Sequence, residues 1–264
     1  MTEATPAAPQ AREDPLPVDP EGGGNGSVRT LRRITAEAAA RLDWAAEDLL
    51  EATLRHGLFG KAAVVSSFGA EAAVLLHMVG ELKPDTPVLF LDTGKHFGET
   101  LRYRDSLVEA LGLSDVRSIS PDPEVLTRED ADGLLFARDA DRCCHLRKVL
   151  PLEQALAPFD AWVTGRKRHQ GTTRSALPTV EFDGRHSKVN PLAHWTVEAV
   201  ERYLARHDLP RHPLAAEGYR SIGCMTCTAR TTPAQDARAG RWPGSAKTEC
   251  GIHARPLTAS DPSP

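Results

Sequence analysis

The chain alternates between segments with helical spacing of apolar residues and short segments that are apolar throughout. Residues 62–65 and 88–91 are short apolar runs, each followed by small or polar residues and then by a helical pattern. Residues 115–119 and 161–164 have a similar character. Strands buried on both faces have continuous apolar runs, and their alternation with helices is typical of βαβ units. The pattern predicts an α/β fold with a doubly wound, mainly parallel sheet.

Apolar residues at helical spacing predict the helices around this sheet. We expect one helical face between residues 31 and 56, a helix after residue 71, and a third helix over residues 196–207. In the second helix the apolar face consists of Val74, Leu75 and Met78. In the third helix the inward residues are expected to be Val197, Val200 and Leu204.

Composition changes this picture mainly at the N-terminus. Residues 1–28 are rich in Pro, Ala, Glu and Gly, with too few large apolar side chains to offset the entropy lost on ordering. We expect a disordered tail over residues 1–28 and an α/β nucleotide-binding domain over residues 29–222. Residues 223–264 would form a C-terminal segment with catalytic residues.

Charge and hydropathy exclude some classes of protein. The formal net charge of -4 argues against nonspecific binding to nucleic acid or to an acidic membrane surface. No apolar run approaches the roughly 20 residues of a transmembrane helix, and the N-terminus lacks the features of a secretory signal. We therefore expect a cytoplasmic protein without nucleic-acid or membrane partners.

The five cysteines fall into three groups along the chain. Two close pairs, Cys143 with Cys144 and Cys224 with Cys227, could bring four thiolates around one iron-sulfur cluster or one zinc ion. The second pair alone would also fit a dithiol redox motif. Zinc sites more often use Cys-x(2 to 4)-Cys on both sides, so the adjacent first pair favours a [4Fe-4S] cluster.

Cys250 stands apart from these pairs and is a candidate nucleophile. Lys247 and His253 are its neighbours in the sequence, and a cationic environment favours the thiolate form. A free cysteine is more commonly a small buried hydrophobe. The polar surroundings of Cys250, which include Gly251, favour a reactive thiol instead.

Ligands of doubly wound sheets bind where the strands end at their carboxyl edges. Residues 66–71 follow the first predicted strand and precede a helix. Small side chains at the start of a helix let backbone N–H groups bind an anion. An ordinary turn between a strand and a helix has the same composition. Residues 91–94 repeat the layout one unit later, and neither loop is a Walker A motif. The candidate nucleotide-binding residues are Ser67, Gly69, Ala70, Glu71, Leu91, Asp92, Thr93 and Gly94.

A basic segment over residues 164–174 follows another predicted strand. It contains four Lys or Arg residues, and arginine forks suit phosphate or sulfate. An isolated basic loop is usually only solvated, but its place at the strand edge favours an anionic ligand. Arg238, Arg241 and Lys247 precede Cys250 and could close over the same crevice.

Together these residues resemble the assimilatory adenylylsulfate (APS) reductases of bacteria and plants, within the wider phosphoadenylylsulfate reductase family. The resemblance covers about residues 60–253 and implies an adenine nucleotide α-hydrolase-like, or ATP pyrophosphatase-like, fold with a C-terminal catalytic tail. The motifs that carry it are Ser66-Ser67-Phe68-Gly69-Ala70-Glu71, Leu91-Asp92-Thr93-Gly94, Cys143-Cys144-x-x-Arg147-Lys148 with Pro151-Leu152, Gln170 with Thr173-Arg174, Gly218-Tyr219-Arg220-Ser221-Ile222-Gly223-Cys224-x-x-Cys227-Thr228, Arg238-Ala239-Gly240-Arg241-Trp242 and Lys247-Thr248-Glu249-Cys250-Gly251-Ile252-His253.

The resemblance implies an activity in sulfate assimilation and cysteine biosynthesis. The Cys250 thiolate would attack the sulfur of adenosine 5′-phosphosulfate, AMP would leave, and thioredoxin or a similar dithiol would release sulfite. The paired cysteines would hold a [4Fe-4S] cluster with a structural and electrostatic role. The further substrate-binding residues implied are Lys148, Arg168, Arg238, Arg241 and His253. The oligomeric state is left open, and a homo-oligomer is compatible with the sequence.

Some positions depart from the family pattern. Relatives usually have Arg-Arg-Asp-Gln-Ser where this chain has Lys167-Arg168-His169-Gln170-Gly171, and Thr226 replaces a common Pro. Two alternative functions remain. A phosphoadenylylsulfate reductase would generally keep the tail cysteine but lack the paired ones. A zinc-containing nucleotide-binding module or thiolation enzyme would use the paired cysteines for zinc.

Overall fold

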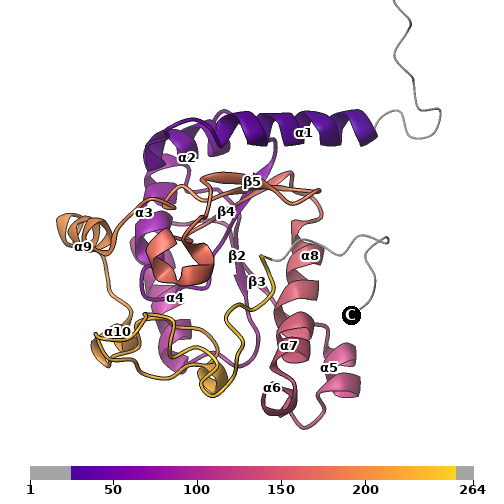
Figure 1. Cartoon of the computed structure of the whole chain (residues 1–264), viewed down its shortest axis with the longest axis vertical. Coiled ribbons are helices and arrows are strands. Elements are labelled where there is room, and N and C mark those ends of the chain that lie inside the picture. Colours follow the sequence, from indigo (N-terminus) through magenta and orange to yellow (C-terminus); the bar gives the residue numbers. More distant parts are fainter. Residues whose placement is uncertain (1–24, 254–264) are drawn as a thin grey trace, which may run out of the picture.

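The structure is a computed structural model that describes residues 25–253. Its centre is a six-stranded sheet with the order β3-β2-β1-β4-β6-β5 (Figure 1). All neighbouring strands are parallel except β5 and β6, which are antiparallel. The strands are β1 Ala62–Val65, β2 Val88–Leu91, β3 Val116–Ile119, β4 Ala161–Thr164, β5 Val180–Phe182 and β6 Ser187–Val189. The predicted α/β class with a mainly parallel sheet is confirmed.

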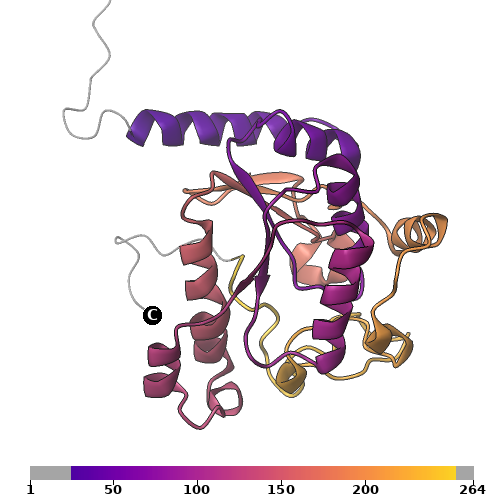
Figure 2. The same ribbon diagram turned by 180° about the vertical axis from the view of Figure 1, so that it is seen from behind.

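Helices cover both faces of this sheet, as Figures 1 and 2 show from opposite sides. The α-helices are α1 Asn25–Ala39, α2 Ala46–Leu54, α3 Ala72–Leu82, α4 Gly98–Ala110, α5 Pro123–Glu129, α6 Leu135–Arg138, α7 Ala140–Cys144, α8 Leu150–Leu156, α9 Val197–Arg206 and α10 Pro213–Ala216. A π-helix, η1 His145–Val149, joins α7 to α8, and the short 3-10 helices are η2 Arg168–Gln170, η3 Thr172–Arg174 and η4 Met225–Cys227. Among the described residues, no helix is both long and apolar enough to cross a membrane.

Alternate residues of the central strands pack into two separate cores. Val64 and Phe90 belong to the larger core, which α1, α2, α3, α4 and α9 complete. Leu89 and Trp162 point the other way and pack with α8. Successive side chains of a strand point to opposite faces, so a strand covered on both sides is apolar throughout. This is why the central strands could be identified from the sequence, and the two cores make the sheet doubly wound.

The N-terminal helical region differs from the expectation. The predicted face over residues 31–56 is split into α1 and α2 by a turn, in which Leu42 N and the Trp44 indole both donate to the Ala39 carbonyl, at 3.1 and 2.9 Å. Helix α1 begins at Asn25, so the end of the segment expected to be disordered is helical. Residues 1–24 lie outside the described residues, and the domain division at residue 222 stays a prediction.

Helix α9 has the predicted extent but not all of the predicted inward residues. Val200 and Leu204 are buried, whereas Val197 is 44% exposed. Thr196 caps the helix by accepting a hydrogen bond from Ala199 N at 3.2 Å. Val197 therefore lies in the first turn, at the rim of a cavity rather than in the core.

Candidate active site

A cavity of about 880 Å³ opens beside the carboxyl ends of β1 and β4. These two strands are parallel neighbours, but the chain continues from β1 to β2 and β3 on one side and reaches β4 on the other. Ligands of doubly wound sheets bind where the strand order reverses in this way. The volume lies within the usual range of about 300–1,000 Å³ for ligand pockets. The cavity is therefore the candidate active site.

The loop after β1 is shaped by the buried Phe68. Its φ angle is 48°, its ring packs edge-on against Phe90 with centroids 5.6 Å apart, and its N–H donates to Ser66 Oγ at 3.1 Å. A large residue with positive φ is uncommon and needs such support. With Phe68 held in the core, Ser67 and Gly69 on either side of it line the cavity.

Glu71 joins this loop to the loop after β4. Its Oε2 accepts hydrogen bonds from Lys167 Nζ and Gln170 Nε2, both at 2.8 Å. Burial alone would raise the pKa of Glu71, but the hydrogen bond from His169 and the charge of Lys167 hold it well below its usual range. Glu71 is therefore an anion that fixes two walls of the cavity relative to each other.

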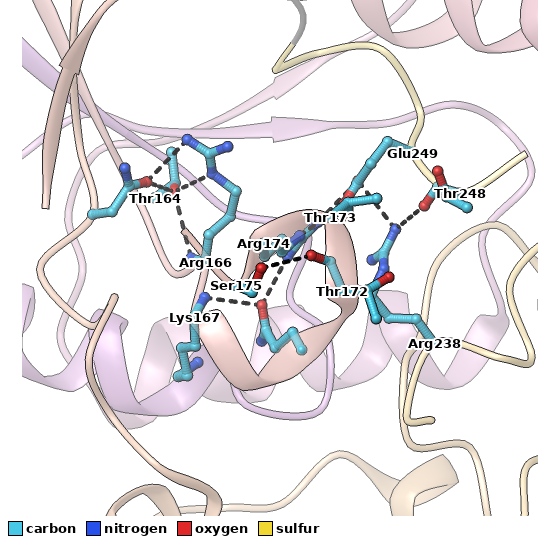
Figure 3. A network of polar contacts seen from close by, with 12 residues as sticks. Thr164, Arg166, Lys167, Thr172, Thr173, Arg174, Ser175, Arg238, Thr248 and Glu249 are labelled. Atoms are coloured by element: carbon cyan, nitrogen blue, oxygen red, sulfur yellow. Dashed lines mark hydrogen bonds and ion pairs between the residues drawn. The ribbon is translucent and has the colours of Figure 1, made fainter. Parts of the chain in front are cut away.

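Two arginines at the cavity hold the carboxylate of Glu249 (Figure 3). Arg174 donates to both oxygens, with Nε–Oε1 at 2.8 Å and Nη2–Oε2 at 3.0 Å, and Arg238 Nη2 lies 3.0 Å from Oε2. Despite burial, Arg174 lowers the pKa of Glu249 below its usual value. These contacts anchor the C-terminal segment, so that Cys250 also lines the cavity.

Arg166 is held at the cavity by polar side chains from β5, from the end of β4 and from the residue after β6. Its guanidinium pairs with Glu181 of β5 and donates to Asn190 Oδ1 at 3.2 Å. Thr164, at the end of β4, donates to the same Asn190 oxygen at 2.7 Å. Burial lowers the pKa of Arg166 from its usual value, yet its paired carboxylate keeps it a cation.

His253 closes the end of the cavity next to β4. Its ring stacks on Trp162, with centroids 5.1 Å apart and planes 3° from parallel, and its carbonyl accepts from Lys188 Nζ at 3.2 Å. Burial, followed by the charge of Arg166, lowers the pKa of His253 well below its usual value. His253 is therefore a neutral imidazole at neutral pH, and its buried Nδ1 has no hydrogen-bond partner within the described chain.

The paired cysteines come together beside Cys250. Cys144, Cys224 and Cys227 share one buried cluster with Trp242, against which Cys250 packs. Cys143 packs in an adjoining cluster and interacts electrostatically with Cys224 and Cys227. None of these thiols is in a disulfide.

The backbone that carries the first pair is unusual. The helix changes from α7 to the π-helix η1 directly after Cys144, and Arg147 lies in this π-helix. Arg147 Nε and Nη2 bind Asp130 Oδ2 at 3.1 and 2.5 Å, and Nη1 donates to the Thr93 carbonyl at 2.8 Å. π-Helical turns occur frequently at functional sites. The irregular turn directly follows the pair, which ends the regular helix α7.

Lys148 connects the paired cysteines to the cavity. It lines the cavity, and the sulfurs of Cys224, Cys250 and Cys144 raise its pKa although its burial acts in the opposite direction. Burial would also raise the pKa of Cys224, but Lys148 and a 3.2 Å contact with Thr93 Oγ1 lower it. Burial raises the pKa of Cys144 to about 11.

The donor set suits a metal group bound by sulfur. Four buried thiols from two segments would be costly as uncompensated thiolates, and a metal group would supply the compensating positive charge. Within residues 25–253, no three or more His, Cys, Asp or Glu side chains are placed so that they could hold a metal ion.

Most of the predicted substrate-binding residues meet at the cavity. Those that line it, together with Cys250, are Ser67, Gly69, Ala70, Glu71, Leu91, Lys148, Arg238, Arg241 and His253. Asp92, Thr93 and Gly94 do not line it, and Thr93 instead contacts Cys224. Arg168 does not line it either, because its side chain donates to the Leu177 carbonyl at 2.8 Å.

Four further charged residues line the cavity although they were not among the predicted substrate-binding residues: Arg166, Lys167, Arg174 and Glu249. All of them lie in the basic segment or the terminal motif, so the charged composition of these two segments indicated that some of their residues would bind an anion. Which of several adjacent cations faces the cavity depends on the turn that the chain makes after β4.

Comparison with known proteins identifies relatives over most of the chain. The family described as "Phosphoadenosine phosphosulfate reductase domain" matches residues 61–230. A protein of Mesorhizobium japonicum named adenosine 5′-phosphosulfate reductase is 51% identical over 213 residues, covering 81% of this chain and 84% of that protein. A protein of Chelativorans sp. with the same name is 50% identical over 216 residues, covering 81% and 88%.

A solved structure has the same fold. The crystal structure of phosphoadenylyl-sulfate reductase from Candida auris, in a phosphate complex, superimposes with a TM-score of 0.61 at 24% identity. The match covers 75% of this chain and 96% of that one. The predicted fold class is thereby confirmed.

Proposed function

The chain belongs to the phosphoadenosine phosphosulfate reductase family, and from this premise we propose that it reduces adenosine 5′-phosphosulfate to sulfite and AMP in assimilatory sulfate reduction. The observation that carries the proposal is the position of Cys250. Its thiol lies at the wall of a cavity formed by the loops of β1 and β4 and lined with cations. Relatives named adenosine 5′-phosphosulfate reductase at 50% and 51% identity support this choice of substrate.

In the first step, the Cys250 thiolate attacks the sulfate sulfur of the substrate. A bond forms between Sγ and that sulfur, the bond from sulfur to the phosphate oxygen breaks, and its electron pair leaves with AMP. The enzyme is left with an S-sulfocysteine. Covalent catalysis of this kind divides one difficult reduction into two easier steps.

In the second step, a thiolate of an external dithiol attacks Cys250 Sγ. Sulfite leaves with the electron pair of the S–S bond, and a mixed disulfide forms. The second thiol of the partner then breaks this disulfide, so that the partner is oxidised and Cys250 returns to its thiolate. We propose a thioredoxin-like dithiol as the partner and the cytoplasm as the location.

The cations of the cavity have an electrostatic role in this reaction. Lys148, Arg174, Arg238 and Arg241 are among the cations that line the cavity with Cys250. Charge that moves onto the phosphate as the S–O bond breaks is stabilised by fixed cations, most strongly where water is excluded. Neutral His253 would offer its buried Nδ1 as a hydrogen-bonding atom at the same place.

We propose that Cys143, Cys144, Cys224 and Cys227 hold a [4Fe-4S] cluster. Their thiols are buried. The Thr93 hydroxyl lies 3.2 Å from Cys224 Sγ, and the charge of Lys148 lowers the pKa of Cys224. Residues that contact metal ligands in this way orient them and adjust their basicity. When bound, the cluster would supply structural support and an electrostatic field close to Cys250.

The 3′-phosphorylated substrate is the second candidate, because the family's description and the Candida auris structure name it. We expect adenosine 5′-phosphosulfate to be strongly preferred, since the more similar relatives are named for it. The specificity constants for the two substrates separate these candidates. Equal constants would contradict the preference.

A reaction without reductant tests the mechanism. Incubation with adenosine 5′-phosphosulfate should release one AMP per active site and leave a stable mass increase of one SO₃ group on Cys250. Cys250→Ser should still bind nucleotide but give neither the adduct nor sulfite when thioredoxin is added. Normal turnover by this variant, or an adduct on Cys224 or Cys227, would show that the mechanism is wrong.

A further inference from the structure

We propose that His169 is a doubly protonated imidazolium that positions the cavity wall by holding Glu71, so that anionic substrate binds less tightly once His169 loses its proton. The identity of the substrate in this inference rests on the proposed function. His169 lines the cavity, but no step of the proposed reaction uses it.

The geometry around the imidazole favours two N–H groups. Nδ1 lies 2.9 Å from the carbonyl oxygen of Trp195, and Nε2 lies 3.5 Å from Glu71 Oε1. A neutral imidazole has one N–H and one lone pair. It would therefore turn a lone pair either toward a carbonyl or toward a carboxylate, and only the cation presents a hydrogen to both acceptors. Nε2 is buried and makes no hydrogen bond within the described chain, so its one polar contact there is the 3.5 Å ion-pair contact with Glu71 Oε1.

The surrounding charges favour the same form. Glu71 faces His169 from the start of α3, Lys167 from its own loop, and Glu198 from the first turn of α9. Lys167 is itself paired with Glu71 at 2.8 Å, which offsets its repulsion. The interaction with Glu71, at 3.5 Å, raises the pKa of His169 above its usual value, although burial opposes this.

Loss of this proton would weaken the contact between Glu71 and the loop that carries His169, without unfolding either segment. Glu71 would keep Lys167 and Gln170, each at 2.8 Å, but would face a lone pair of His169. The cavity would also lose one positive charge, and its proposed ligand is an anion. We expect the dissociation constant to rise by about three- to tenfold as His169 loses its proton, because binding of the anion and protonation of His169 are linked.

Binding of adenosine 5′-phosphosulfate to the Cys250→Ser protein tests this directly. The substitution prevents reaction and removes the titration of the thiol, and the substrate has no group that titrates between about pH 6 and 9. Calorimetry should show the dissociation constant rising across this range.

Three variants in this background separate His169 from other groups. His169→Arg keeps a charge and several donors, so its affinity should stay close to the low-pH value throughout. His169→Gln should have the weaker, high-pH affinity throughout. His194→Gln is the matched control, because His194 is exposed on the neighbouring loop, and it should keep the original pH profile.

The results can overturn the inference independently of the proposed function. A dissociation constant that does not change with pH, or a His169→Gln variant that keeps the pH profile, would contradict it. If the substrate did not bind at any pH, the proposed function would be wrong, and the charge of His169 would still be measurable. In ¹⁵N-imidazole spectra, the signal lost in His169→Gln should titrate above the usual pKa of about 6.5, and titration below it would refute the inference.

Discussion

At the scale of residues, one guanidinium connects three parts of the candidate site. Arg147 pairs with Asp130, and both side chains are buried. The same group binds the Thr93 carbonyl at 2.8 Å, while the Thr93 hydroxyl contacts Cys224. Removing one partner of a buried pair leaves an uncompensated charge and costs about 3–5 kcal/mol. Arg147 therefore keeps the π-helix and the loop after β2 in fixed positions around the paired cysteines.

The role of the paired cysteines leads to a prediction about iron. Serine is a harder and weaker ligand for iron-sulfur clusters than a thiolate. Replacing Cys143, Cys144, Cys224 or Cys227 with Ser should therefore lower the iron content and the activity together. Iron per chain and visible absorption of anaerobically purified protein measure this. Cys250→Ser is the control and should retain its iron, whereas full iron retention in two or more ligand variants would exclude this assignment.

At the scale of elements, the C-terminal segment reaches the sheet through a few contacts. Glu249 holds it to Arg174 and Arg238, Ile252 packs against the core on the α8 side, and His253 stacks on Trp162. Figure 1 shows this segment, in yellow, running back from the region of α10 toward the strands. The segment places Cys250 between the cavity and the paired cysteines.

Glu249→Gln should therefore slow the first chemical step. Without the carboxylate, the segment is held less firmly and the thiol is in position for less of the time, so we expect AMP release in a single turnover to fall by about tenfold or more. AMP itself should bind as tightly as before or more tightly, because Arg174 and Arg238 become free to bind phosphate. Glu217→Gln, which alters a surface pair with Arg230, is the control. An unchanged rate of AMP release would contradict the role of Glu249.

At the scale of the whole molecule, the ion pair of Glu71 and His169 links global stability to pH. The pKa of His169 is raised on folding. Its contribution to the free energy of unfolding is therefore complete below about pH 6.5 and is lost as the pH rises through the pKa of the folded state. The pKa of Glu71 is lowered, so its contribution is present above about pH 4.3 and is lost in acid. The ion pair should stabilise the folded state most between about pH 5 and 6.5.

Thermal unfolding measures this dependence. Near pH 6, His169→Gln should lower the melting temperature by about 2–4 °C, as expected for about 1 kcal/mol in a chain of this size. The difference should shrink toward pH 9, where the imidazole of the parent protein is neutral. A difference that stays constant from pH 6 to 9 would show that the ion pair does not contribute in this way.

The sequence by itself determined the parts of this protein that depend on local patterns. The strands β1, β2 and β4 are covered on both faces, and their continuous apolar runs are visible in single short segments. The grouping of the cysteines separated Cys250 from the other thiols in the same way. Edge strand β5 and its neighbour β6 were not found, because each has only three residues and includes a charged one, Glu181 or Lys188.

Only the tertiary structure decided which side chains face the cavity. Lys167 turns inward to Glu71 while its neighbour Arg168 turns away to a backbone carbonyl, although the two cations look alike in the sequence. Thr93 turns to Cys224 instead of the cavity, and Glu249 reaches Arg174 across most of the C-terminal half of the chain. The physical reason is that burial periodicity is a property of one element. The direction of a loop side chain instead depends on partners that folding brings from distant segments.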